Sequence, residues 1–541
     1  MELSRRDLLA AATAGAGALA LGPAFLREAL AAPAKAGASP YGPLGPPDAN
    51  ELMLPPGFSS RIIARAGEPM PGSGYVWPIF PDGQATYRTG DGGWILVTNA
   101  ESGAPSGAGA SATRFRADGT IVDAYRILGG TDFNCAGGAT PWGTWLSGEE
   151  TEDGLVWECD PAGKLPAEAR PAMGAFKHEA VAVDPVAGQL YLTEDNNPGG
   201  FYRFTPRNYP DLSEGLLEIA QMGKKGRVTW LKVPDPTTAQ TGTPTVGQVP
   251  GATYFLNGEG IWYARGILYF TTKTDKRVWA YDAERRRMHV IFDRALAQDS
   301  SLDAVDNVTV TAVGDVLVCE DGGNMEIGLI TSDREVSPLL RFTGTAHSSS
   351  EVAGAVFNPA GDRLYCTSQR AAGGGMVYEI SGPFRVPKRG VPKDLIFGPP
   401  AGEARPSGPL NPGADRDDPD GRLKARRRVG RRSLARHGLA IRLRLDEAAS
   451  VAAVLDTPAL ANEPQEDRPV PRPKRTILAR ARARYERDQG TVKVVLRPGG
   501  RARRALGRVN DPVRARILVS AVDGAGNERV FTRRVTIGAG N

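Results

Sequence analysis

Four carboxylic acids stand at the heads of four short strand patterns that repeat in the middle of the chain. They are Glu179, Glu259, Asp306 and Glu351. If these strands line one channel, the carboxylates point into a common space and repel each other unless cations compensate them. Oxygen ligands of this kind suit Ca²⁺ or Fe³⁺ far better than zinc. The pattern favours a metal site; in the alternative interpretation the acids cap loops or pair with arginines.

A second set of polar residues lies beside these strands. Acids end the neighbouring strands at Glu101, Glu149-Glu150, Glu194-Asp195 and Glu320-Asp321. Cys135 lies in a glycine-rich turn, where a metal would hold it as a thiolate. Without a metal it would be a small buried hydrophobe, as we expect for Cys159, Cys319 and Cys366.

Several other chemistries are excluded by what the 541 residues do not contain. There are four histidines and four cysteines, with no CxxC pair, no H-E-x-x-H, no Walker loop and no G-x-S-x-G. A histidine-rich zinc site, a thioredoxin-type redox motif and a serine-hydrolase triad therefore have no support.

The elements that must position these acids are short β-strands in residues 45–385. Each repeat has an acid-headed strand, a turn, a second strand with polar residues at its end, and a third strand that is usually aromatic. Two looser copies lie at Gly93–Arg126 and Cys135–Pro161, and one copy is stretched by an expected loop at 207–250. Six copies about 45 residues apart predict a β-propeller of about six blades rather than a β-sandwich.

The N-terminal 32 residues are typical of an export signal. Arg5-Arg6 precede an Ala/Gly/Leu run and a small-residue cleavage site near Ala31. The paired arginines indicate the twin-arginine export machinery, which carries folded proteins. We expect the mature protein to act outside the cytoplasm, in the periplasm, at the cell surface or beyond it.

The C-terminal part differs in charge from the rest of the chain. A linker rich in Pro, Gly and Asp (386–421) precedes residues 422–541, where short alternating strands predict a small immunoglobulin-like β-sandwich. Residues 421–541 hold 29 Lys/Arg and 11 Asp/Glu, so the mild net charge of +5 is a cancellation between an acidic body and a basic end. This charge could bind an anionic cell-wall polymer, or it is a solvated surface. No motif indicates nucleic-acid binding, and we expect a monomer.

The segment Asn134–Glu150, NCAGGATPWGTWLSGEE, closely resembles the signature of PhoX-type alkaline phosphatases. Residues Lys177–Pro185, Asp306–Val308 and Cys319–Gly322 are similar to that family as well, and the likeness covers about residues 45–385. The resemblance implies a six-bladed propeller that holds iron and calcium and hydrolyses phosphate monoesters. It implies Cys135, Glu150, Glu179 and Glu259 as iron ligands, with calcium ligands at Asp306, Glu320 and Asp321, and weaker candidates at Glu101 and Glu194.

The chain departs from the family pattern at two positions. Asn257 stands where the family usually has a phosphate-clamping arginine, and Ala100 stands where it tends to have histidine. Lys273, Lys276 or Arg277 could supply the lost positive charge. Lys273 and Arg277, with Glu259, are the catalytic candidates. We expect a metal-dependent phosphomonoesterase. The alternatives are a non-catalytic propeller stapled by metals that binds a partner, and a calcium-dependent propeller phytase or lactonase.

Overall fold

The computed structural model describes residues 34–103, 107–297, 299–387, 390–391, 421–426, 428–445, 449–458, 475–485, 491–498, 503, 506, 512–523 and 528–538. The predicted export signal (1–32) and most of the predicted linker (386–421) lie outside these residues. Contacts divide the chain into two units, Met1–Ser407 and Gly408–Asn541. Within the described ranges, no helix is long and apolar enough to cross a membrane.

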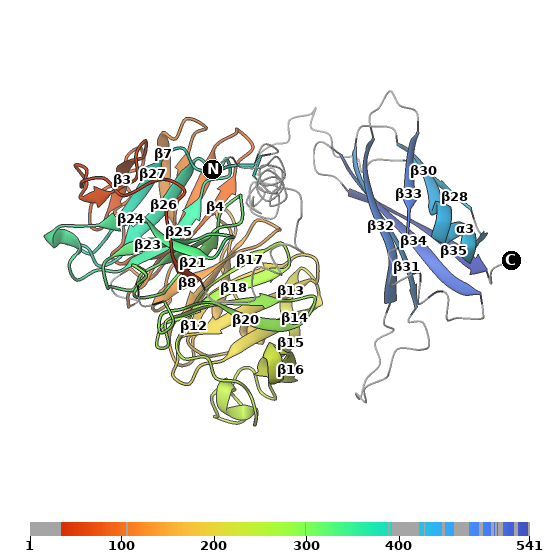
Figure 1. Ribbon diagram of the computed structural model, residues 1–541, viewed down its shortest axis with the longest axis horizontal. Coiled ribbons are helices and arrows are strands. Elements are labelled where there is room, and N and C mark those ends of the chain that lie inside the picture. The colour runs from red at the N-terminus through yellow and green to blue at the C-terminus, as the bar shows by residue number, and fades with distance from the viewer. Residues whose placement is uncertain are drawn as a thin grey trace, which may run out of the picture. The chain divides into compact units, whose positions relative to one another are not determined.

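The first unit contains six sheets that follow one another along the chain (Figure 1). The first sheet contains β4 (Pro81–Arg88), β5 (Trp94–Ala100), β6 (Gly109–Phe115) and β7 (Ile121–Leu128). The second contains β8 (Asn134–Ala139), β9 (Trp145–Glu149), β10 (Val156–Cys159) and β11 (Glu168–Ala169). The third contains β12 (His178–Asp184), β13 (Gln189–Glu194), β14 (Phe201–Asn208), β15 (Asp211–Met222) and β16 (Val228–Lys232). The fourth sheet contains β17 (Gly258–Ala264), β18 (Ile267–Thr272), β19 (Arg277–Asp282) and β20 (Arg287–Asp293). The fifth contains β21 (Val308–Val310), β22 (Val316–Cys319), β23 (Glu326–Ile330) and β24 (Glu335–Phe342). The sixth contains β25 (Val352–Phe357), β26 (Arg363–Ser368), β27 (Met376–Ser381) and β3 (Ser59–Arg65). Short 3-10 turns lie at Pro171–Met173, Lys224–Gly226, Thr245–Gln248 and Thr345–His347.

These sheets form the six blades of a β-propeller, as the repeats predict. The innermost strands β4, β8, β12, β17, β21 and β25 each contact the next, and β25 contacts β4, so the ring is closed. The sixth blade takes its outermost strand, β3, from the N-terminal part of the unit, and pairs it with β27. This pairing ties the two ends of the propeller together.

Three details differ from the prediction. Cys135, which is expected in a glycine-rich turn, lies in strand β8. The first blade begins at β4, upstream of Gly93, because the segment PDGQATYR is too polar to show an apolar strand pattern. The expected loop at 207–250 contains β15 and β16, which extend the third blade to five strands. Two further short strands, β1 (Lys35–Ala36) and β2 (Leu52–Met53), pair with β24.

Aromatic side chains fill the space between neighbouring blades. Phe201 of the third blade stacks on Phe270 of the fourth, with ring centroids 4.5 Å apart. Trp94 of the first blade donates its indole N–H to the hydroxyl of Tyr365 in the sixth, 3.1 Å away. These contacts explain why the repeats are rich in aromatic residues: each ring buries a large apolar area against the next blade.

The second unit has two sheets around one hydrophobic core. The sheets are formed by β28 (Gly421–Ala425), β30 (Leu439–Leu445) and β33 (Val492–Leu496), and by β29 (Arg428–Gly430), β35 (Glu528–Gly538), β34 (Val513–Asp523), β31 (Ala449–Pro458) and β32 (Arg475–Tyr485). Helix α3 (Arg431–His437) buries Leu434. Ile441 and Val494 of one sheet pack with Leu455 and Ile517 of the other, so this unit is a β-sandwich. Its immunoglobulin-like connectivity stays a prediction.

Candidate metal centre

Four innermost strands carry a β-bulge at the same place, close to the start of the strand. The pairing register shifts between Pro81 and Gln84, Asn134 and Gly137, His178 and Val181, and Gly258 and Ile261. The first residue inside each bulge is Asp82, Cys135, Glu179 or Glu259. A bulge re-aims a side chain, and here the repetition brings four metal-ligating types to one end of the channel.

Small residues follow these side chains because the inner strands converge closely. A Cβ added to Gly83 would lie 2.5 Å from Cα of Ala136, and one added to Gly260 would lie 2.6 Å from Cα of Asn307. Only glycine fits such an approach between two backbones. The Asp-Gly and Glu-Gly pairs are therefore part of how the ligand-bearing strands reach one another.

The side chains form three overlapping groups in which the ligand atoms lie within 4.8 Å of one another. They are Asp82–Glu101–Cys135, Cys135–Glu150–Glu179, and Glu179–Glu259–Asp306. Cys135 and Glu179 are each shared by two groups. Six predicted ligands thus come together, and Asp82 joins them.

The ends of the second strands supply Glu101 and Glu150, and strand alternation decides which acid of each pair takes part. Glu150, rather than Glu149, belongs to the group. In the third blade Asp195 lies beside Lys273, whereas Glu194 accepts hydrogen bonds from the Gly200 N–H and the Tyr202 hydroxyl, both 2.7 Å away. Successive strand residues point to opposite faces, so a shift of one residue turns Glu194 away from the ligand groups.

The two acids predicted in the fifth blade, Glu320 and Asp321, also differ in their surroundings. Glu320 accepts backbone N–H groups of Asp303 and Glu326, at 2.6 and 2.8 Å, so protein donors use its oxygens. Asp321 lies at the edge of the ligand groups, with one oxygen 3.5 Å from Nζ of Lys273. Neither belongs to the three groups of ligand atoms.

Burial and mutual repulsion raise the pKa values of the clustered acids. Burial, followed by the charge of Glu101, raises the pKa of Asp82 to about 7. Burial, followed by the charge of Asp195, raises the pKa of Glu150 to about 8. Burial and the charge of Glu259 raise the pKa of Glu179 well above its usual value. The Cys135 thiol also has a raised pKa, chiefly from burial and then from Asp82.

The unsatisfied oxygens of Glu179 test whether these residues fit a metal. This side chain is fully buried, and within the described part of the chain neither of its carboxylate oxygens has a hydrogen-bond partner. A buried carboxylate without partners costs several kcal/mol. Bound cations would satisfy those oxygens and hold the neighbouring carboxyls ionised, so the residues fit a metal cluster.

Two cations lie against the acids, and one predicted cation does not. Nζ of Lys273 lies 2.7 Å from Oε1 of Glu259. Burial disfavours the ammonium of Lys273, but Glu259 and Asp195 outweigh burial and raise its pKa. Arg370 donates to Glu101 and Glu351, both at 3.0 Å.

Arg277, by contrast, pairs with Asp275 and Asp293, at 3.0 and 2.8 Å, within its own blade. It therefore does not join the ligand groups.

Three residues of the site, Asp82, Gln369 and Arg370, are not among the residues that the sequence predicts. The Asp82-Gly83 pair repeats the pattern of Glu259-Gly260, which could have revealed the first acid. Gln369 donates to Asp82 and, at 2.7 Å, to Glu101, and it follows β26 as Glu101 follows β5. Aligning the strand ends of the repeats would have found Gln369 and, next to it, Arg370.

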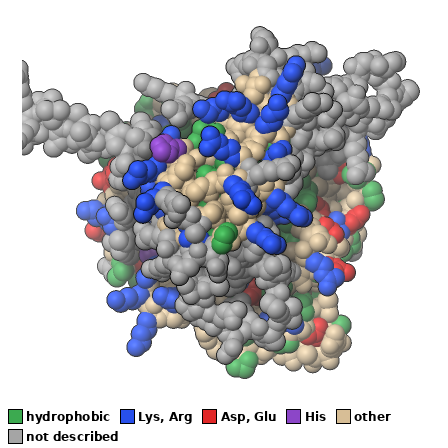
Figure 2. Space-filling view, turned by 90° about the vertical axis from the view of Figure 1, so that its right-hand side faces the viewer, with side chains coloured by type: hydrophobic (Ala, Val, Ile, Leu, Met, Phe, Trp, Pro, Cys, Tyr) green, Lys and Arg blue, Asp and Glu red, His purple; other side chains and the backbone are tan. Residues whose placement is uncertain are grey.

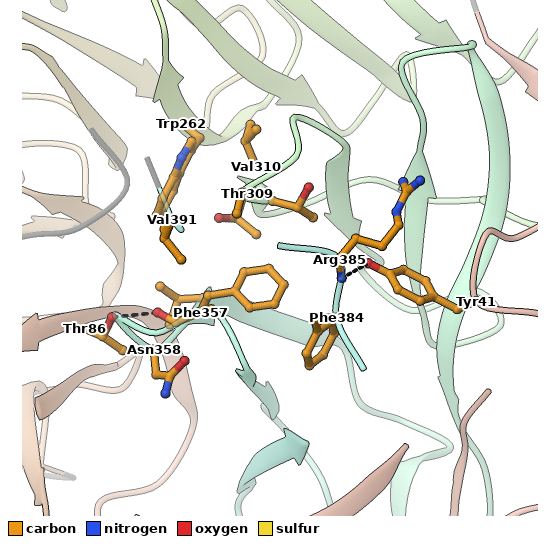
Figure 3. A pocket seen from close by; sticks show the side chains of 14 residues that line it. Tyr41, Thr86, Trp262, Thr309, Val310, Phe357, Asn358, Phe384, Arg385 and Val391 are labelled. Atoms are coloured by element: carbon orange, nitrogen blue, oxygen red, sulfur yellow. Dashed lines mark hydrogen bonds between the residues drawn. The ribbon is translucent and has the colours of Figure 1, made fainter. Parts of the chain in front are cut away.

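A separate hollow lies toward the other ends of the inner strands (Figure 3). It is lined mainly by apolar side chains, including Trp262, Phe357 and Phe384. Val310 and Phe357 are the last residues of β21 and β25, whereas the acids lie at the strand starts. None of the described residues that line this hollow is a predicted ligand.

A propeller with a cysteine and buried carboxylates at one end of its channel can hold metal ions there. The sequence matches the family described as Alkaline phosphatase PhoX over residues 97–158, 152–290 and 279–372. Together these matches span half of the chain. The chain belongs to the PhoX alkaline phosphatase family, and no curated protein matches its sequence.

Solved structures with a similar fold are distant. A luciferin-regenerating enzyme is 13% identical, with a TM-score of 0.36, and the match covers 63% of this chain and 100% of the other. A gluconolactonase from Xanthomonas campestris is 12% identical (TM-score 0.37; 64% and 99% covered), and regucalcin, a calcium-binding protein from Agrobacterium tumefaciens, is 12% identical (TM-score 0.35; 60% and 97% covered). Likenesses of this size carry no argument about activity.

Proposed function

We propose that this protein is an exported, metal-dependent phosphatase that hydrolyses phosphate monoesters and releases inorganic phosphate. One observation carries the proposal: in a chain of the PhoX family, Cys135, Glu150 and Glu179 offer ligand atoms that lie within 4.8 Å of one another. Bound metal ions would neutralise the charge of the phosphate and stabilise the charge that develops during phosphoryl transfer.

The donor sets support two kinds of ion. Cys135 with Glu150 and Glu179 combines one sulfur and two carboxylates, which suits iron. Glu179 with Glu259 and Asp306 offers oxygen alone, which suits calcium. We therefore assign iron to the group that contains the thiolate and calcium to the all-oxygen group.

Lys273 and Arg370 supply fixed positive charge beside the metal centre. Their side chains are 36% and 42% exposed, so a phosphate that approaches the acids from solvent meets both cations. Arg370 can hold a phosphate oxygen through its planar guanidinium group. Asn257 donates to Asp195 at 2.6 Å and carries no charge, so these two cations take over the role of the family's arginine.

Phosphate release from p-nitrophenyl phosphate tests the proposal. A metal-replete sample should turn over the ester, and a chelator should abolish turnover. Turnover that is absent, or that a chelator does not change, contradicts a metal-dependent phosphatase. Metal analysis of the same sample separates the alternatives: iron with calcium supports the phosphatase, and calcium alone favours a phytase or lactonase. Both metals without turnover favour a binding scaffold.

Export by the twin-arginine route and action as a monomer outside the cytoplasm complete the proposal. The paired arginines Arg5-Arg6 support the twin-arginine export route. Replacing both with lysine should retain the protein in the cytoplasm, which fractionation of the expressing cells measures. Sedimentation of the purified protein measures its mass in solution, and a dimer would contradict the expected monomer.

A row of cations in the second unit supports another function, binding of a linear phosphate polymer. Lys424 pairs in register with Arg442, which pairs with Lys493, so three exposed cations lie side by side across one sheet. Figure 2 shows lysine and arginine side chains gathered on the side where β28 and β30 lie in Figure 1. Like charges directly opposite each other destabilise a sheet, and a polyanion relieves their repulsion.

The aromatic content argues against a nucleic acid as this polymer. Residues 422–541 contain one tyrosine, one phenylalanine and no tryptophan, too few for a platform on which bases stack. A phosphate polymer without bases therefore fits better. Changing Lys424, Arg442 and Lys493 to glutamine should weaken binding of long-chain polyphosphate at least tenfold. Changing the exposed Lys164, Lys224 and Lys225 of the propeller should not. Equal loss in both variants, or tighter binding of DNA than of polyphosphate, contradicts this function.

A further inference from the structure

The residue that follows the second strand is fixed in the same way in four consecutive blades. Its backbone N–H donates to the carbonyl of the residue two positions before the bulged ligand. The pairs are Glu101 to Phe80, Glu150 to Phe133, Asp195 to Lys177 and Lys273 to Asn257, at 2.9, 2.9, 3.2 and 2.8 Å. Three of these equivalent positions hold a carboxylate, and the fourth holds Lys273.

The ammonium of Lys273 lies among carboxylates from three neighbouring blades. Nζ is 2.7 Å from Glu259 of the fourth blade, 3.4 Å from Asp195 of the third and 3.5 Å from Asp321 of the fifth. Three acids around one cation form the kind of oxygen shell that Ca²⁺ takes. Without a cation among them, the three acids would repel one another.

We propose that the ammonium of Lys273 takes the place of a divalent cation between Asp195, Glu259 and Asp321. The residue that follows the second strand of the fourth blade, Lys273, then supplies a positive charge of the protein itself. The residues at the equivalent positions of the first three blades are acids. The chain accordingly binds one calcium ion fewer than it would bind with a carboxylate at position 273. This inference rests on the proposed function only in that the channel acids bind metals.

Removing the ammonium should create a calcium site in the full-length protein. We expect Lys273→Asp to bind one more calcium ion per chain than the wild type, measured by metal analysis and by calorimetric titration with CaCl₂. Lys273→Met, which keeps the length of the side chain, should melt at a lower temperature in chelator, and millimolar calcium should restore its melting temperature. Lys273→Arg keeps the charge and should bind no additional ion.

Lys276→Met is the matched control. Lys276 pairs with Asp303 alone among the described carboxylates, at 3.8 Å, so its loss should leave the calcium count unchanged. If Lys273→Asp and the wild type bind equal calcium, or if calcium fails to restore Lys273→Met, Lys273 is an ordinary ion-pair residue and the inference is overturned. These measurements need no phosphatase turnover, so their outcome is separate from that of the proposed activity.

Discussion

Asn99 of the first blade holds the bulge that carries Cys135 in the second. Its side-chain amide donates to the carbonyl of Cys135 at 3.1 Å and to that of Ala136 at 2.8 Å. Its own oxygen accepts from Trp145 and Ser147, at 2.9 and 3.0 Å, so the amide cannot rotate without losing four contacts. The position of the only cysteine in the ligand groups of the described residues thus depends on an uncharged residue of the neighbouring blade.

Replacing Asn99 should weaken metal binding without removing a ligand. We expect Asn99→Leu to lower metal affinity about tenfold to a hundredfold, the usual effect of losing a group that orients a ligand. Titration of the chelator-treated protein with metal measures the change. Asn358→Leu, which removes an amide bonded to Asp362 in the sixth blade, is the control and should keep wild-type affinity. Equal affinities in the two variants would show that Asn99 does not orient Cys135.

Cys135 should determine iron binding. Cys135→Ser keeps the size of the side chain but replaces the thiolate, so we expect the iron content to fall severalfold while calcium bound to the all-oxygen group stays. Cys159→Ser is the control, because Cys159 is buried but lies outside the ligand groups. Metal analysis and the visible absorption of the iron–thiolate pair report the result. Full iron in Cys135→Ser would disprove the thiolate assignment.

Glu179→Gln should change stability in opposite directions with and without metal. In chelator, the variant no longer buries a carboxyl that lacks partners, so its free energy of unfolding should rise by about 1–3 kcal/mol. In metal-replete buffer the variant lacks a ligand shared by two groups and should become the less stable protein. Melting temperatures under both conditions test this crossing.

Glu152→Gln is the control for Glu179→Gln. The Glu152 side chain is 74% exposed, so this variant should not reverse its stability order between chelator and metal-replete buffer. If Glu179→Gln is also the more stable protein in metal-replete buffer, Glu179 does not bind metal.

Much of the architecture follows from the sequence because the repeats are regular. Turn residues and apolar strands recur at a constant spacing, and each acid at a strand head marks an inner strand, so the blades and the clustered acids Glu179, Glu259 and Asp306 could be predicted. Glu101 and Glu150 follow from the acids at the ends of neighbouring strands, and Cys135 from its glycine-rich segment and the family resemblance. The repeat pattern places the start of the first blade too late, because β4 is polar and three of its eight residues are Gly, Gln and Thr. Its acid, Asp82, was missed for the same reason.

The other misses depend on details that spacing does not contain. A run such as Glu194-Asp195 gives two acids on opposite faces, and only the register of the strand end tells which one faces the ligand groups. The sequence offers Lys273 as a source of the lost positive charge, and the structure shows that its ammonium contacts three carboxylates from three blades. That contact joins residues 195, 259, 273 and 321 and needs the three-dimensional arrangement of the blades.

His347 should make stability fall as the pH drops below neutrality. Burial lowers the pKa of His347 below the ordinary value of 6.5; the charge of Glu51 raises it by a smaller amount, and the charge of Arg65 lowers it further. The imidazole ring also shares a hydrogen bond with the Ser368 hydroxyl and lies near the Tyr378 hydroxyl. Because the unfolded chain binds the proton more readily, stability is lost as the pH falls from about 6.5 toward the folded value.

The slope due to this one residue is at most about 1.4 kcal/mol per pH unit. We expect His347→Asn to melt with a shallower pH dependence than the wild type between pH 7 and 5.5. The exposed His437 is the control, and His437→Asn should keep the wild-type slope. Parallel curves for all three proteins would exclude His347 as the source.

The propeller should keep its metals and its activity without the basic sandwich. The buried core of the second unit consists of residues from Val429 to Ile537, with Leu423 and Ala425 packed against it, and the three groups of ligand atoms found among the described residues all belong to the first unit. A chain that ends at residue 391 should therefore bind the same iron and calcium per molecule and hydrolyse p-nitrophenyl phosphate at the rate of the full-length protein. It should lose binding to polyphosphate, which depends on the cations of the second unit. Metal analysis, turnover and co-sedimentation with polyphosphate measure the three properties on one sample. Loss of metal from a shortened chain that still melts cooperatively would mean that the sandwich supports the metal centre, contrary to this division of roles.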